Sequence, residues 1–281
     1  MHRHIRIILL SLLLNVCCIA SLTAQTRRVQ NRPYTDLRPI HFGIVVGANM
    51  QDTKFENIGP QILTLKDGTQ VASNIAVEQD NWDTGFNVGV LAEMRLNEYF
   101  QFRIAPQMTF GSRNLKFFNY LKTAENATAA AEAIAAQALA EGSEEGQEET
   151  PVLPAAGPVI EKQSLKTVYV GANLDIIFAS KRFNNHRPYV MAGIAPMINL
   201  STKANDYIQM KKYDVFFEVG IGCDLYLPFF KLRPELKFMM GLTNSLNTDH
   251  AYDLNNIDQM PYAACARSAR SKMLVLSFYF E

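Results

Sequence analysis

Side chains that could carry out catalysis or bind a metal ion are sparse in this sequence. Beyond its first 24 residues the histidines are His41, His186 and His250, and none has a metal-ligand spacing to another histidine, a cysteine or a carboxylate. A lipid-modifying enzyme needs a nucleophile with a histidine base near the lipid boundary, and the apolar segment around Ser277 contains no histidine. Only His250, in a loop, could fold back towards such a nucleophile. We therefore expect no enzyme activity, no cofactor and no metal.

Charged side chains recur instead at every second position of otherwise apolar segments. Such alternation places the charges on one face of a strand and the apolar residues on the other. Charges gathered on one face could relay protons or form structural ion pairs, and ion pairs are the commoner use. The residues expected in this charge network are Glu93, Arg95, Arg103, Asp175, Glu218, Asp224, Arg233, Glu235 and Lys237.

The alternation is clearest over residues 85–111. Phe86, Val88 and Val90 share one face, the pattern breaks at residues 97–99, and it resumes with Phe100 and Phe102. Two period-two segments across so short a break predict an antiparallel hairpin. Period-two segments of this kind occupy residues 41–52, 85–96, 100–111, 167–178, 188–199, 214–227, 230–242 and 273–281.

Three architectures would suit these strands: a soluble sandwich, a soluble barrel with an apolar interior, and a membrane barrel with an apolar exterior. The connections alternate between long and short, as in outer-membrane barrels. An eight-stranded barrel is too narrow inside for some five large apolar residues from each strand, whereas glycines and paired charges fit. The sequence therefore predicts an all-β fold, an eight-stranded antiparallel up-and-down transmembrane β-barrel in the outer membrane.

The ends of the chain fit this location. Residues 1–24 have a basic start, an apolar core and small residues before Gln25, as a secretory signal peptide does. Residues 25–40 are polar and predict a periplasmic leader, with the barrel at 41–281. Cys223 and Cys265 lie in a strand and in a late loop, so we expect no disulfide. Neutral net charge, without a basic stripe or a phosphate-binding loop, excludes nucleic acid and indicates no small-molecule substrate.

A long insertion occupies about residues 115–160. Its alanine-rich stretch, Thr123–Glu141, predicts a helix in one extracellular loop, followed by an acidic and proline-containing linker. This insertion is either an exposed functional knob or a tolerated addition to a loop tip.

The junction of leader and first strand resembles the start of the PorT family of outer-membrane barrels, which is associated with type IX secretion. The similarity rests on Arg28-Val29-Gln30-Asn31, Pro33, Asp36, His41-Phe42-Gly43, Gly47, Asn49 and Asp52, and on the closing segment Ser277–Glu281. The resemblance implies a non-enzymatic accessory or assembly role in protein secretion, with other secretion components as periplasmic partners. The alanine-rich insertion departs from the family pattern.

A docking surface for such partners would lie at the periplasmic rim, where basic residues gather. The candidates are Arg28, Asn31, Tyr34, Asp36, His41, Arg182 and His186. The same rim could instead face phospholipid head groups. The alternative function is a stand-alone structural or surface-interaction barrel of the small outer-membrane protein type, whose long loops bind an external partner.

Overall fold

The structure is a computed structural model that describes residues 31–64, 68–79, 81–125, 128, 159–201, 206–253 and 259–281. The predicted signal peptide, the docking candidate Arg28 and most of the alanine-rich insertion lie outside the described residues. No helix within these ranges has the length and hydropathy needed to cross a membrane.

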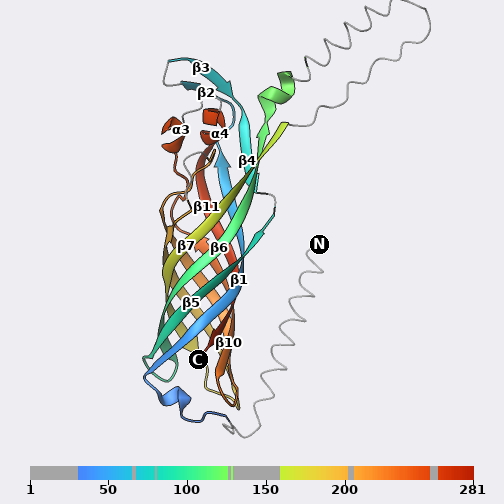
Figure 1. The fold of residues 1–281 in the computed structure, drawn as a ribbon. Helices are drawn as coiled ribbons and strands as arrows, with labels where there is room; N and C mark the ends of the chain where they lie inside the picture. The colour runs from blue at the N-terminus through green and yellow to red at the C-terminus, as the bar shows by residue number, and fades with distance from the viewer. Residues whose placement is uncertain are drawn as a thin grey trace, which may run out of the picture.

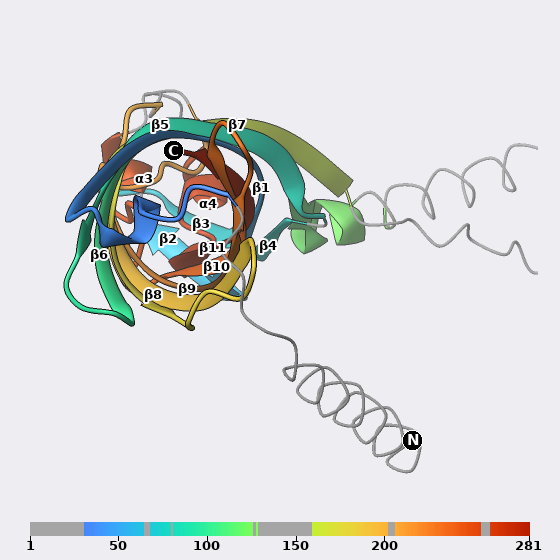
Figure 2. The same cartoon turned by 90° about the horizontal axis from the view of Figure 1, so that it is seen from below.

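The described chain forms a closed antiparallel barrel, as the period-two pattern predicts (Figures 1 and 2). Each strand of the wall pairs with the next wall strand in sequence, and β1 pairs with β11 to close the wall. The wall consists of β1 (Ile40–Asn57), β5 (Asp83–Arg95), β6 (Phe100–Asn119), β7 (Val159–Ala179), β8 (His186–Asn199), β9 (Tyr213–Tyr226), β10 (Lys231–Gly241) and β11 (Ala266–Phe280).

The two ends of the barrel differ in their connections. At one end, short turns join β5 to β6, β7 to β8 and β9 to β10, and β11 terminates there (Figure 1). At the other end the connections are long. Outer-membrane barrels keep their short turns in the periplasm and their long loops outside the cell, which orients this barrel.

The outward face of the wall is apolar over a band of limited height. On β7 the outward residues from Val168 to Phe178 span ten residue steps, which at about 3.3 Å each and a tilt of about 45° correspond to roughly 23 Å. Phe42 is 73% exposed and Ile221 61% exposed on this face. Such exposure of large apolar side chains over a band about 25 Å tall is the signature of a lipid-facing surface.

The outer edge of this band can be placed on two strand pairs. Met50 on β1 pairs with Leu274 on β11, and the next outward pair is the charged one formed by Asp52 and Lys272. On β6 and β7 the pair Phe110–Val168 is likewise followed by Ser112–Lys166. The change from apolar to polar residues in paired positions marks the membrane boundary.

The strands continue well beyond this boundary, which corrects two predictions. β6 and β7 pair up to Asn119 and Val159, so the insertion at about 115–160 is confined to residues 120–158, of which 120–125 are helical. The loop expected between the first two predicted strands contains three more strands, and the last loop contains two short helices. These are β2 (Gln61–Thr64), β3 (Gln70–Ser73), β4 (Ile75–Gln79), α3 (His250–Asp253) and α4 (Met260–Ala263).

Above the boundary the interior of the barrel contains an apolar cluster. We call this extracellular region, formed by the upper strands with β2–β4, α3 and α4, the cap (Figure 1). Phe117 packs edge to face against Tyr207 and Tyr262, with ring centroids 5.6 and 5.7 Å apart. The cluster comprises Ile75, Val77, Leu115, Phe117, Leu165, Ile208, Met210, Leu246, Tyr262, Cys265, Ala266 and Ala269.

Candidate functional site

Within the membrane, the barrel interior is filled by charged and aromatic side chains that the alternating strands point inward. Glycines on facing strands make room for them. A Cβ atom on Gly193 would lie 2.3 Å from a carboxylate oxygen of Asp175, and one on Gly222 would lie 2.3 Å from the ring of Tyr189. The glycines that recur in the polar faces are therefore needed for the large side chains opposite them.

Arg103 on β6 lies at the centre of one ion-pair cluster. Its Nε donates to Asp175 Oδ2 at 2.8 Å and its Nη2 donates to Glu235 Oε1 at 2.9 Å. The hydroxyls of Tyr189 and Tyr279 donate to the two oxygens of Glu235 at 2.7 and 2.9 Å. All of these side chains are buried, so the cluster joins β6, β7, β8, β10 and β11 across the lumen.

Arg233 on β10 forms a second cluster closer to the periplasm. Its guanidinium donates to both oxygens of Glu93 and, at 2.5 Å, to Asp224 Oδ1. Lys231 Nζ lies 2.8 Å from a carboxylate oxygen of Glu281 and 3.5 Å from Asp224. A buried cation with two or more carboxylate partners is held in one geometry by hydrogen bonds.

A third layer is built on Lys237. Its Nζ lies 3.0 Å from Glu218 Oε2, which also accepts a hydrogen bond from Asn173 Nδ2 at 2.9 Å. Gln107 donates to Asn173 at 2.7 Å, which extends the chain of contacts to β6. The three layers together occupy the lumen with side chains that are almost wholly inaccessible.

Arg113 forms the uppermost polar layer, and the sequence analysis overlooked it. Its guanidinium donates to Gln51 Oε1 at 3.3 Å, to Ser271 Oγ at 3.0 Å and to the Tyr169 hydroxyl at 3.3 Å, all neutral groups. The sequence could have revealed it, because Arg113 lies ten residues after Arg103 on the same strand and therefore on the same inward face. The same alternation places Lys231, Tyr189 and other tyrosines on the inward face.

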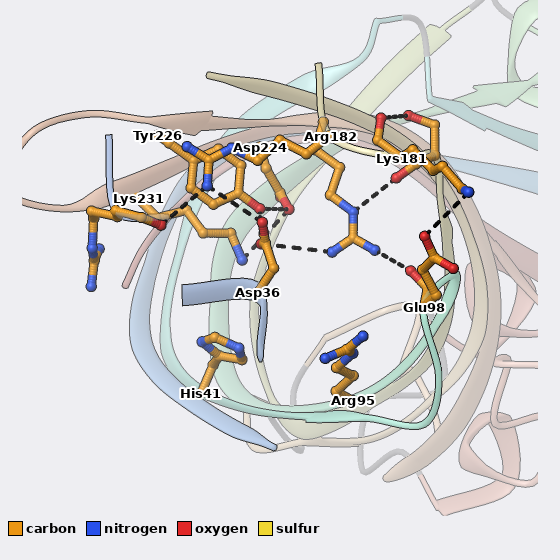
Figure 3. A network of polar contacts seen from close by, with 12 residues as sticks. Asp36, His41, Arg95, Glu98, Lys181, Arg182, Asp224, Tyr226 and Lys231 are labelled. Atoms are coloured by element: carbon orange, nitrogen blue, oxygen red, sulfur yellow. Dashed lines mark hydrogen bonds and ion pairs between the residues drawn. The ribbon is translucent and has the colours of Figure 1, made fainter. Parts of the chain in front are cut away.

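One predicted member of the lumen network lies elsewhere, which is a correction. Arg95 is the last residue of β5 and its Nε donates to the carbonyl of Asn97 in the exposed turn. In Figure 3 it stands at the mouth of the barrel without a dashed contact. The alternation alone could not show that the strand ends before this side chain reaches the ion pairs.

The leader closes the periplasmic mouth of the barrel. The 3-10 helix η2 (Thr35–Leu37) lies across the opening (Figure 2), and Asp36 accepts a hydrogen bond from the Tyr226 hydroxyl and lies 3.4 Å from Arg182 Nη1 (Figure 3). Arg182 also donates to the carbonyls of Asn31 and Arg32, and its guanidinium stacks 3.6 Å from the Tyr226 ring. We call this set of contacts the leader latch.

The predicted docking residues thus fall into two groups. Asn31, Asp36 and Arg182 form contacts with one another and with their neighbours in the leader latch. His41 lies 3.8 Å from Glu281 with 10% of its side chain accessible. Tyr34, which is 76% exposed, and the exposed His186 remain available at the rim.

The remaining reactive side chains have structural surroundings. His250 Nε2 lies 2.7 Å from the carbonyl oxygen of Asp206 inside the cap. Cys223 and Cys265 are free thiols, and burial raises the pKa of Cys265 to about 12. A thiol with a raised pKa is a poor nucleophile and a poor metal ligand. Across the residues that the structure describes, no cluster of histidine, cysteine and carboxylate side chains could hold a metal ion.

Comparison with solved structures finds small outer-membrane proteins. Neisserial surface protein A is 11% identical, with 86% of this chain and 98% of that chain covered and a TM-score of 0.38. OprG from Pseudomonas aeruginosa is 10% identical over 86% and 94% of the two chains, with a TM-score of 0.40. Ail, the attachment invasion locus protein of Yersinia pestis, is 10% identical over 86% and 98%, with a TM-score of 0.34.

No curated protein matches the sequence. A family model does: residues 23–247 match the outer membrane protein beta-barrel domain, which is most of the chain. The match covers the leader, the strands up to β10 and the loops between them, in agreement with the closed barrel and its lipid-facing band. The chain therefore belongs to the outer membrane protein beta-barrel domain family and resides in the outer membrane.

Proposed function

We propose that this protein is a non-enzymatic barrel with a closed lumen that acts at the cell surface, where its cap binds an external partner. The observation that carries this proposal is the contrast between the two halves of the barrel interior. Side chains such as Arg103, Arg233 and Tyr279, each fully buried, fill the lumen, which supports a closed barrel. The cap, by contrast, has a hydrophobic core of its own that fixes a defined external surface.

The exposed edge of the cap is the place to look for that partner. Ile62 on β2 is 71% exposed at the extracellular tip of the molecule. Large contiguous apolar patches mark interaction sites, whereas a single exposed residue does not, so Ile62 serves here as the position of a probe at the tip of the cap. The small hairpin of β2 and β3 is positioned by β4, whose pairing with β6 anchors it to the barrel wall.

A second candidate function is an accessory role in type IX secretion, as the leader resemblance implies. The observation in its favour is an exposed apolar surface at the periplasmic end, where Tyr34 is 76% and Leu37 63% exposed beside the leader latch. A secretion component could dock there without opening the barrel.

Photo-crosslinking from two positions separates these functions. A photoreactive residue in place of Ile62 should capture a partner added outside intact cells, whereas one in place of Tyr34 should capture none under the same conditions. Capture from Tyr34 alone, together with loss of protein export in a deletion strain, would support the secretion role instead. Normal export in that strain would contradict it.

A further inference from the structure

Two buried carboxyl groups face each other in the lumen across a glycine. Asp175 of β7, Gly193 of β8 and Glu218 of β9 lie at paired positions on three neighbouring strands. Two strand spacings, about 9.6 Å, separate the backbones of Asp175 and Glu218. A Cβ atom on Gly193 would clash with Asp175 Oδ1, so this oxygen occupies the space above the glycine. The two carboxyl groups lie within hydrogen-bonding reach of each other, and we call them the carboxyl pair.

Each member of the carboxyl pair has one oxygen that no donor reaches. Arg103 donates to Asp175 Oδ2 at 2.8 Å, and Asn173 donates to Glu218 Oε2 at 2.9 Å. Within the described chain Asp175 Oδ1 and Glu218 Oε1 accept no hydrogen bond, although both side chains are fully buried. A buried carboxylate oxygen without a donor is costly. When two such oxygens lie within reach of each other, a proton on one of them satisfies both.

The charges around the carboxyl pair leave one negative charge unmatched. Among the described residues, the cations within ion-pair distance of the pair and of neighbouring Glu235 are Arg103 and Lys237. Two cations thus face three carboxyl groups. The groups that face them from β8 and β11 are the hydroxyls of Tyr189 and Tyr279, which donate to Glu235 and add no charge.

The neighbouring layers have no positive charge to spare. The layer nearer the periplasm combines two cations with three carboxylates and a histidine, namely Arg233 and Lys231 with Glu93, Asp224, Glu281 and His41. In the layer above, Arg113 interacts with the carboxylate of Asp214. The missing positive charge must therefore come from outside the chain.

We propose that the carboxyl pair is a proton-binding site, which holds one proton at neutral pH between Asp175 Oδ1 and Glu218 Oε1. The proton resides on Glu218, because two nitrogens of Arg103 lie 2.8 and 2.7 Å from Asp175 Oδ2 and favour the charged form of Asp175. Its release at alkaline pH leaves two carboxylates that repel each other, which weakens the barrel. The site goes beyond the proposed function, because it lies in the closed lumen and not in the cap.

The pH dependence of folding tests the site, with reversible urea unfolding of the full-length barrel in lipid vesicles as the measurement. Unfolded Asp and Glu lose their protons at about pH 3.9 and 4.3, so above about pH 5.5 the folded barrel alone retains this proton. The stability of the wild type therefore falls as the pH rises. Glu218→Gln places an amide donor where the proton was and removes this dependence. Between about pH 5.5 and 7, the unfolding constant of the wild type should rise about tenfold per pH unit relative to that of Glu218→Gln.

Glu93→Gln is the matched control. It also replaces a buried inward glutamate, but both oxygens of Glu93 accept hydrogen bonds from Arg233. This variant should be less stable than the wild type by a constant factor over the same range and should keep the wild-type dependence on pH. The histidines titrate alike in all three proteins, so their contribution cancels in the ratios.

Infrared spectroscopy detects the proton itself. In a detergent without carbonyl groups at neutral pH, the wild type and Glu93→Gln should show the band of a protonated carboxyl group, and Glu218→Gln should lose it. Parallel pH profiles of the wild type and Glu218→Gln, or no such band in the wild type, would overturn the proposal. Replacement of sodium and potassium by choline should leave the stability of the wild type unchanged. A loss that Glu218→Gln does not share would show a bound metal cation and would overturn the proton assignment.

Discussion

Apolar side chains point outward in the lower half of β6 and inward in the upper half, although the alternation of the strand continues unbroken. Between Phe100 and Phe110 the outward residues are apolar and the inward ones, such as Arg103, are polar. Beyond Ser112 the inward residues Leu115 and Phe117 are apolar and the outward residues Asn114 and Lys116 are polar. One continuous strand thus serves first as a membrane wall and then as the wall of a water-exposed domain.

The comparison shows that the solvent outside decides what fills the inside. Where lipid surrounds the barrel, burial of apolar residues inside contributes little folding free energy. The narrow interior is filled instead by ion pairs that join the strands of the wall. Where water surrounds it, the hydrophobic effect drives the same inward positions to form the cap core. The following changes test the two halves against each other.

The largest effect is expected from Arg103→Met. Removal of the guanidinium leaves the buried carboxylates of Asp175 and Glu235 without their cation, which costs about 3–5 kcal/mol of folding free energy. Urea unfolding in lipid vesicles measures this loss. The triple variant Arg103→Met/Asp175→Asn/Glu235→Gln should regain most of the stability. Equal destabilisation by the single and triple variants would contradict the ion-pair account.

A somewhat smaller loss is expected from Leu115→Ala in the cap core. Leu115 is 1% exposed, so the change leaves a cavity and costs about 3 kcal/mol. The matched change Leu276→Ala lies on the lipid face, where lipid chains fill the space, and should cost about 1 kcal/mol or less. Equilibrium unfolding of both variants provides the comparison, and equal losses would count against a water-excluded core in the cap.

Ile104→Arg tests the outward face of the same strand. An arginine near the middle of the lipid-facing band should cost about 2–4 kcal/mol and slow insertion into vesicles. Asn114→Arg, on the same face above the boundary, should insert at the rate of the wild type. If both variants inserted equally well, the boundary between Phe110 and Ser112 would be misplaced.

The smallest effect is expected at the leader latch. Arg182→Met removes the ion pair with Asp36 and the hydrogen bonds to the carbonyls of Asn31 and Arg32, which should loosen the leader by about 1 kcal/mol. Chymotrypsin cleavage after Tyr34 should then be several times faster, without a change in global unfolding. Lys181→Met, beside the latch, serves as the control and should leave cleavage unchanged.

The sequence predicted the lower half of the barrel and missed most of the upper half for a physical reason. A charged side chain that faces lipid costs free energy, so the membrane-spanning strands keep their charges on the inward face. Arg103 and Glu235 could therefore be placed inward from spacing alone. In the cap the alternation continues through Leu115 and Phe117, but the inward side chains are apolar there, so the extension of the strand resembled a loop.

The leader latch could not be predicted either. Its contacts join Asp36 and Asn31 to Arg182 and Tyr226, which lie some 150 to 190 residues away in sequence. Only the closure of the barrel brings these residues together at one mouth. Arg95 fits the alternation but lies at the end of β5, so the pattern placed it in the lumen network although it contacts the exposed turn.

Spin labels along the outward face of β6 test the inversion most directly. Labels at Met108, Phe110, Asn114 and Lys116 in the barrel reconstituted in bilayers should divide into two classes by their collisions with oxygen and with a water-soluble nickel complex. Positions 108 and 110 should be accessible to oxygen and shielded from nickel, and positions 114 and 116 should show the reverse. Nickel accessibility at 108, or oxygen-dominated accessibility continuing to 116, would contradict the membrane boundary on which this account depends.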